Sequence, residues 1–183
     1  MDYIKIFGAY SWTVNTEGQG DKDKNKISIR AINEIVKRVQ KRLESYYKNH
    51  PNTQCPKLFY SRLRATSGSL VFTSIRERMT SAYAIIFDIT GFNPNVMLEL
   101  GIALELQQHL DNPAKVFLIA YSKEFSENLL PSDIRGYFLT TYYYVDEKKN
   151  EITLGDSGSL VMRMTSDILE KLKVSYIEYQ NQE

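Results

Sequence analysis

The sequence predicts an α/β fold in which a parallel β-sheet is covered by helices on both faces. Short apolar stretches alternate with longer stretches whose apolar residues recur every three or four positions, so strands and helices alternate along the chain. One stretch, "YAIIFDI" (83–89), is apolar almost throughout. This is typical of a strand at the centre of a parallel sheet, which is buried on both faces. At this chain length we expect residues 1–183 to form a single domain.

The first half of the chain begins with a strand at 3–10, followed by a polar loop, "SWTVNTEGQGDKDKNK" (11–26). A second strand is expected at 57–63, between two helices. The first helix is predicted by apolar side chains at helical spacing: Ile32, Ile35, Val36, Val39, Leu43 and Tyr47. The second lies within 67–82 and places Leu70, Val71, Ile75 and Met79 on one face.

The second half continues the alternation after the central strand. A helix is expected from Asn93 onward, followed by a fourth strand at 114–121, a short helical turn at 130–138 and a fifth strand, "TTYYYV" (140–145). The polar connection at 146–159 has room for a short extra strand. A last helix is expected at 160–174.

Right-handed crossovers between five such strands suit a flavodoxin-like three-layer sandwich, with a five-stranded parallel sheet in the order 2-1-3-4-5. Ligands of such sheets bind outside the carboxyl ends of the strands, where the strand order reverses. Here the reversal lies between strands one and three. "AYSW" (9–12) and "DITGFNPN" (88–95) are therefore expected at the site.

Composition and charge narrow the classes of function. The net charge is +1, so no overall field attracts nucleic acid or an anionic membrane. No apolar run is long enough for a membrane span, and the N-terminus lacks the apolar core of a signal peptide. The single cysteine, Cys55, permits no internal disulfide, and no Cys/His cluster suggests a metal. We expect a cytoplasmic protein without a metal, a nucleic-acid partner or a membrane partner.

The stretch "FDITGFNPNVMLELGIALEL" (87–106) places a carboxylate in an otherwise apolar helix. Asn93 is a plausible N-cap, and Pro94 suits the first helical position. Asn95 and Glu99 then lie four residues apart on one face. Beside the crevice, partial burial should raise the pKa of Glu99. The alternative is a surface glutamate in the second turn, where it favours the helix dipole.

This stretch resembles a signature shared by nucleoside 2-deoxyribosyltransferases and the TIR-like domains related to them. The resemblance implies that Glu99 of "LELGIAL" is the catalytic carboxylate, which attacks or electrostatically supports the anomeric carbon of an N-ribosidic bond. It also places Asn93 or Asn95 where these families contact the sugar. The segment "LPSDIRGYF", with Asp133 and Arg135, is similar to one that follows strand four in TIR-like domains; it assigns these two residues no role.

The sequence departs from the deoxyribosyltransferase pattern in the helix before the third strand. Those enzymes usually carry an aspartate in or near it that helps to protonate or orient the base, and the stretch 67–82 contains none. The resemblance then favours an N-glycosidase acting on NAD or a related nucleoside or nucleotide, because a cationic nicotinamide leaves without a proton. NAD or the nucleotide is the substrate, and no cofactor is expected. Hydrolysis, transfer and cyclisation stay open.

Other functions are compatible with the same fold. A nucleoside 2-deoxyribosyltransferase is one, and a non-catalytic nucleotide-sensing or TIR-like adaptor module is another. The resemblance further implies a homo-oligomer, activated by assembly or by a partner, and a role as a bacterial defence effector.

Residues near the strand ends complete the expected substrate site. Tyr10, Ser11 and Trp12 follow the first strand, and Trp12 suits stacking on a base, although an aromatic there also serves as a hydrophobic plug. Asp88 ends the central strand, where it either binds a ribose hydroxyl or caps the next turn.

A phosphate-binding site is also expected, at the end of the second strand and the start of the helix that follows it. Arg62 and Arg64 end the second strand, and "TSGS" (66–69), with Ser69 as its last residue, precedes the next helix. Arginines and helix N-termini both bind phosphate. The alternative is that the serines only cap the helix, and the second strand lies away from the reversal of the strand order.

Overall fold

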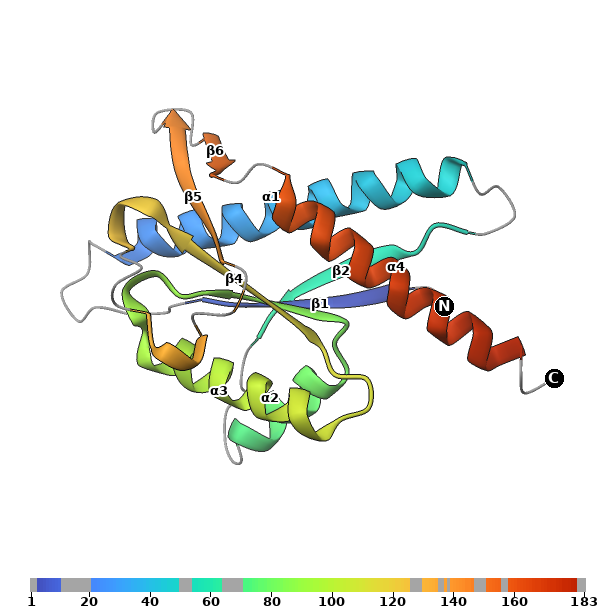
Figure 1. The fold of residues 1–183 in the computed structure, drawn as a ribbon. Coiled ribbons are helices and arrows are strands. Elements are labelled where there is room, and N and C mark those ends of the chain that lie inside the picture. Colours follow the sequence, from blue (N-terminus) through green and yellow to red (C-terminus); the bar gives the residue numbers. More distant parts are fainter. Residues whose placement is uncertain are drawn as a thin grey trace.

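The chain folds into three layers, with a six-stranded sheet between two pairs of helices (Figure 1). The structure, a computed structural model, describes residues 3–10, 21–49, 54–63, 71–125, 130–134, 137, 139–146, 151–155 and 158–180. Helices α1 and α4 cover one face of the sheet, and α2 and α3 cover the other (Figure 1). This confirms the α/β class and the covering of both faces.

The sheet has the order β2-β1-β3-β4-β5-β6. Its parallel strands are β1 (Tyr3–Ala9), β2 (Lys57–Arg62), β3 (Ala84–Asp88), β4 (Lys115–Tyr121) and β5 (Leu139–Asp146). The expected order 2-1-3-4-5 is therefore confirmed for the parallel part. The expected count of five strands is wrong, because β6 (Glu151–Leu154) pairs antiparallel with β5. Leu154 explains the added strand, since pairing with β5 buries its side chain in the core.

The helices are α1 (Asp21–Lys48), α2 (Val71–Thr80), α3 (Pro94–His109) and α4 (Ser159–Gln180). Helix α1 begins before the expected end of the polar loop at 26. The stretch "DKDKNK" is polar but contains neither glycine nor proline, and an aspartate at its start favours the helix dipole. Among the described residues, short 3-10 turns lie at Thr90–Phe92, Ser122–Glu124 and Ser132–Ile134, the last within the expected turn at 130–138.

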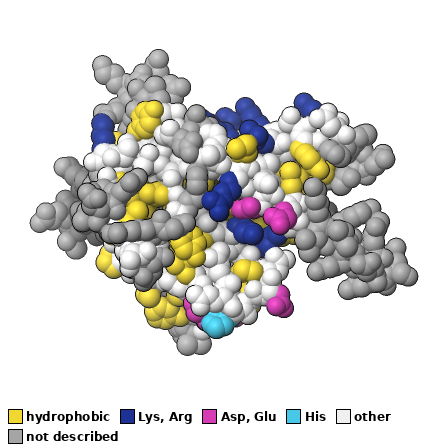
Figure 2. Space-filling model, in the orientation of Figure 1, with side chains coloured by type: hydrophobic (Ala, Val, Ile, Leu, Met, Phe, Trp, Pro, Cys, Tyr) yellow, Lys and Arg dark blue, Asp and Glu magenta, His cyan; other side chains and the backbone are white. Residues whose placement is uncertain are grey.

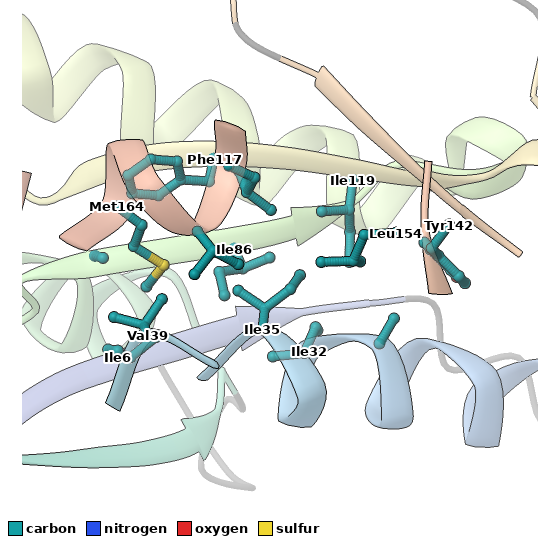
Figure 3. Close-up of a cluster of buried hydrophobic side chains, with 14 of the residues drawn as sticks. Ile6, Ile32, Ile35, Val39, Ile86, Phe117, Ile119, Tyr142, Leu154 and Met164 are labelled. Atoms are coloured by element: carbon teal, nitrogen blue, oxygen red, sulfur yellow. The ribbon is translucent and has the colours of Figure 1, made fainter. Parts of the chain in front are cut away.

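Two apolar cores lie on opposite faces of the sheet because successive side chains of a strand point to opposite faces. In β1, Ile4 and Ile6 pack beneath α1 and α4, whereas Phe7 and Ala9 pack against α2 and α3. Figure 3 shows the first core, in which side chains of α1, the sheet and α4 meet. All five residues of β3 are buried, which confirms β3 as the expected central strand.

The described surface carries charges of both signs. Figure 2 shows acidic and basic side chains beside one another on one face of the molecule. No helix in the described ranges is long and apolar enough to cross a membrane.

Candidate functional site

The candidate site lies at the carboxyl ends of the parallel strands. The strand order reverses between β1 and β3, which is where ligands of such sheets bind. Ala9 pairs with Phe87, so the next residues, Tyr10 and Asp88, end neighbouring strands at the same level. Helix α3, which carries Glu99, begins six residues after Asp88. The fold therefore brings Tyr10, Asp88 and the start of α3 to one edge of the sheet.

The start of α3 is fixed by its capping residues. The Oδ1 atom of Asn93 accepts hydrogen bonds from the backbone N–H groups of Asn95, at 3.0 Å, and Val96, at 3.4 Å. Pro94 occupies the first helical position. The expected N-cap is confirmed, and it places Glu99 in the second turn of α3. Asn95 is exposed, and its sugar contact stays a prediction.

The turn between β3 and α3 is held in an unusual backbone conformation. Gly91 has a φ of 64° and Phe92 a φ of 49°, in the left-handed region that bulky side chains rarely adopt. The Oδ1 atom of Asp88 accepts from the backbone N–H of Thr90 at 3.0 Å and from its hydroxyl at 2.5 Å. Thr90 Oγ1 in turn accepts from the backbone N–H of Tyr121 at 2.8 Å. These bonds stabilise the strained turn, as is common at functional sites.

Asp88 also bonds across the sheet. Its side chain is only 2% exposed, and its Oδ2 atom accepts from the Tyr142 hydroxyl at 2.6 Å. Because that hydroxyl gives its only proton to Asp88, Ser28 of α1 donates to the Tyr142 oxygen, at 3.4 Å. Burial and Asp88 together raise the pKa of Tyr142, so it stays a neutral donor. Both Asp88 oxygens have partners within the protein, as its capping role requires; a ribose contact stays a prediction.

Glu99 has a carboxylate whose pKa is strongly perturbed. Its side chain is partly buried, and this loss of hydration raises its pKa to about 7. The charge of Arg62 acts in the opposite direction. Among the described residues no hydrogen bond or ion pair reaches the carboxylate. The expected rise in pKa is confirmed, and a carboxyl group with this pKa is suited to carry or lose a proton near neutral pH.

Arg62 belongs to the same edge although β2 is the outer strand. It is the last residue of β2 and pairs with Gly8 of β1. Its guanidinium carbon lies 4.4 Å from the centroid of the Tyr10 ring, a cation–π contact. Gly8, the residue that pairs with Arg62, leaves room for the side chain of Tyr60, because a Cβ at Gly8 would meet the Tyr60 ring at 2.8 Å. The glycine thus allows Tyr60 to lie over β1.

The predicted site residues are described in part. Glu99, Tyr10, Asp88, Asn93 and Asn95 lie at the carboxyl edge or in the first two turns of α3. Four others lie outside the described residues: Ser11, Trp12, Arg64 and Ser69. Arg135 and the side chain of Asp133 do so too.

Sequence reasoning missed the residues that hold the site together. Thr90, Tyr142 and Ser28 form the network around Asp88, and none was singled out. A threonine two residues after a strand-ending aspartate is a local turn signal that could have identified Thr90. Tyr142 and Ser28 are distant in sequence, and only the fold brings them to Asp88. The described residues contain no group of three or more His, Cys, Asp or Glu side chains placed to hold a metal ion.

Comparison with known proteins adds no relative: no model of a known protein family matches the chain, and a search of curated proteins finds no match.

Proposed function

We propose that this protein cleaves the bond between C1′ of a ribosyl group and the nitrogen of a base, in NAD or a related nucleoside or nucleotide. Glu99 is the catalytic carboxylate. The observation that carries the proposal is the partly buried Glu99 carboxyl, with a raised pKa and no hydrogen-bond partner among the described residues, on the helix that follows β3 at the reversal of the strand order. Perturbed carboxyl groups without structural partners are typical of active sites.

The chemistry needs a negative charge beside C1′. As the C1′–N bond breaks, its electron pair leaves with the base, and positive charge develops on the sugar. An ionised Glu99 stabilises that charge or adds to C1′ covalently. Water then supplies the hydroxyl of the product and releases a proton, or a second acceptor takes the ribosyl group.

Because its pKa is close to neutral pH, the ionisation of Glu99 depends on the charge of the bound substrate. A pKa of about 7 leaves roughly half of the molecules ionised at neutral pH. A cationic nicotinamide ring placed against the carboxyl group lowers its pKa, because an opposite charge favours the ionised form. A positively charged substrate therefore promotes the active form of Glu99. This favours NAD-like substrates over those with a neutral base.

The surroundings of Glu99 support precise placement of its helix. Asp88 and Thr90 hold the turn before α3, and Asn93 caps the helix itself. The carboxyl group is therefore carried on a rigid element, as catalytic groups require.

The test is release of a free base by purified protein, compared with Glu99→Gln. Glutamine keeps the shape of the side chain but not its charge, and we expect turnover to fall by roughly a hundredfold or more. Glu105→Gln is the matched control, since Glu105 lies on the same helix in an exposed ion pair with Arg76, at 3.2 Å. Equal loss in both variants, or none in Glu99→Gln, would reject the role of Glu99.

A further inference from the structure

The amino ends of β1 and β2 carry aromatic and basic side chains in alternation. Tyr3 pairs with Lys57. Two residues further along both strands, Lys5 pairs with Phe59. Paired residues of parallel strands point to the same face of a sheet, and so do residues two apart in one strand. The four side chains therefore share one face, and we call them the amino-end patch.

The amino-end patch is open to solvent. Tyr3 is 61% exposed and Phe59 is 51% exposed, and both lysines are exposed as well. Further along β1 the same face is covered, because Phe7 packs against the core beneath α2 and α3. The amino end of β1 extends past these two helices (Figure 1). Solvent-facing positions of a sheet are usually polar, so two neighbouring exposed rings indicate a binding surface.

The two lysines of the patch are available to an anionic ligand. In the part of the chain that the structure describes, no hydrogen bond or ion pair engages the ammonium group of Lys5 or Lys57. A ligand with negative charges can therefore bind both groups without displacing a partner within the protein.

The two rings are diagonal neighbours on adjacent strands. Strands lie about 4.8 Å apart and rise about 3.3 Å per residue, which places the Cα atoms of Tyr3 and Phe59 about 8 Å apart. Sheets that bind single-stranded nucleic acid stack successive bases on neighbouring aromatic side chains, and basic side chains bind the phosphates. The amino-end patch contains both kinds of group.

Other occupants match the patch less well. A second copy of the chain, docked through the same patch, would bring four lysines together, and like charges repel. A peptide strand added to the edge of β2 needs free backbone groups, whereas the N–H of Leu58 donates to the side chain of Gln40 at 2.9 Å. Acidic side chains of a peptide would pair with the lysines but would leave both rings exposed.

We propose that the amino-end patch binds single-stranded nucleic acid, with one base stacked on each ring and phosphates beside the two lysines. The expectation of no nucleic-acid partner rests on the net charge of +1, which gives no long-range attraction. The patch acts at contact, through stacking and two local charges. It lies at the amino ends of the strands and the candidate site at their carboxyl ends, so this binding is independent of the proposed cleavage.

Fluorescence anisotropy with a labelled single strand of about eight nucleotides tests the proposal. RNA and DNA of one sequence are compared with an abasic strand of the same length, which keeps the phosphates and lacks the bases. We expect RNA, DNA or both to bind at least about tenfold more tightly than the abasic strand, and the tighter of the two identifies the kind of nucleic acid.

Variants of the rings measure stacking. Tyr3→Thr and Phe59→Thr remove a ring and keep a residue that favours strands, and each should lose about tenfold in affinity for the strand with bases. Tyr3→Phe keeps the ring and should bind as wild type does. Tyr143→Thr is the matched control, since Tyr143 is 41% exposed on β5, which β3 and β4 separate from β1. Thermal unfolding establishes that each variant is folded.

The salt dependence of binding measures the lysine contacts. For single strands, log K falls with log salt with a slope of about −0.7 for each phosphate that is neutralised. Two lysines therefore predict a slope of about −1.4, and Lys5→Met should reduce it to about −0.7. Lys37→Met removes an exposed lysine of α1 and should leave the slope unchanged.

The proposal is overturned if neither RNA nor DNA binds, or if the abasic strand or a glutamate peptide of equal charge binds as tightly. It is also overturned if Tyr3→Thr and Phe59→Thr bind as wild type does, or if Tyr143→Thr loses as much. Glu99→Gln should bind the strand as wild type does, so failure of this binding and failure of base release are distinguishable.

Discussion

Replacing Glu99 by glutamine should make the protein more stable at alkaline pH. The folded-state pKa is about 7, against an ordinary value of 4.5, so the fold prefers the protonated carboxyl group. Stability from this preference is fully present below pH 4.5 and is lost as pH rises through about 7. Above pH 7 the wild-type protein therefore bears the full cost of an ionised, partly buried carboxylate, and Glu99→Gln does not.

The pKa difference sets the size of this effect. At about 1.4 kcal/mol for each tenfold change in proton affinity, a rise from 4.5 to about 7 corresponds to about 3 kcal/mol. The side chain keeps some contact with solvent, which reduces the figure to about 2 kcal/mol. For a chain of this length, 2 kcal/mol raises the unfolding midpoint by roughly 4–8 °C.

Urea unfolding of wild type and Glu99→Gln at pH 5 and pH 8 is the assay. We expect a gain in the free energy of unfolding of about 2 kcal/mol at pH 8 and a much smaller one at pH 5. Glu105→Gln, on the exposed side of the same helix, should change stability by no more than about 1 kcal/mol and should not gain at pH 8. A Glu99→Gln protein no more stable than wild type at pH 8 would show that burial of the ionised Glu99 carboxylate does not destabilise the fold.

Three further outcomes are expected. Tyr142→Phe removes the hydroxyl that donates a hydrogen bond to Asp88 at 2.6 Å, and it should lower the free energy of unfolding in urea by about 1–3 kcal/mol. An unchanged midpoint would show that this hydrogen bond does not stabilise the fold. Gly8→Ala forces a methyl group against the Tyr60 ring, 2.8 Å away, and should cost about 1–3 kcal/mol; a neutral effect would mean that the ring moves freely. The kcat/KM of base release should rise about tenfold per pH unit below about 7 and level off above it, following ionisation of Glu99; a flat profile would contradict a catalytic carboxylate.

The fold was largely predictable because its signals are local. Apolar periodicity identified each helix, and the run of apolar residues at 83–89 identified the central strand. The start of α1 was missed because its polar residues were interpreted as a loop, although a stretch without glycine or proline is compatible with a helix. The sequence did not decide whether a sixth strand forms, because that strand depends on pairing with β5, and this pairing is a tertiary contact.

The candidate site was predictable where one segment contains it. Asn93, Pro94 and Glu99 lie in one short segment, so capping and helical spacing correctly predicted the start of the helix and the turn that carries Glu99. Arg62 of β2 lies over the ring of Tyr10, which follows β1, and its charge lowers the pKa of Glu99 on α3. No local sequence pattern relates these three parts of the chain. The Asp88–Tyr142 bond likewise joins residues 54 apart in sequence.

The proposed cleavage by Glu99 is tested most directly by incubating the purified protein with NAD and a panel of nucleotides and nucleosides, at low and high protein concentration. Chromatography resolves the products, with Glu99→Gln as the comparison. We predict that the wild-type protein releases nicotinamide or another free base and that a folded Glu99→Gln protein does not. Base release that persists in Glu99→Gln, or ligands that bind the wild-type protein and stay uncleaved at every concentration, would contradict it.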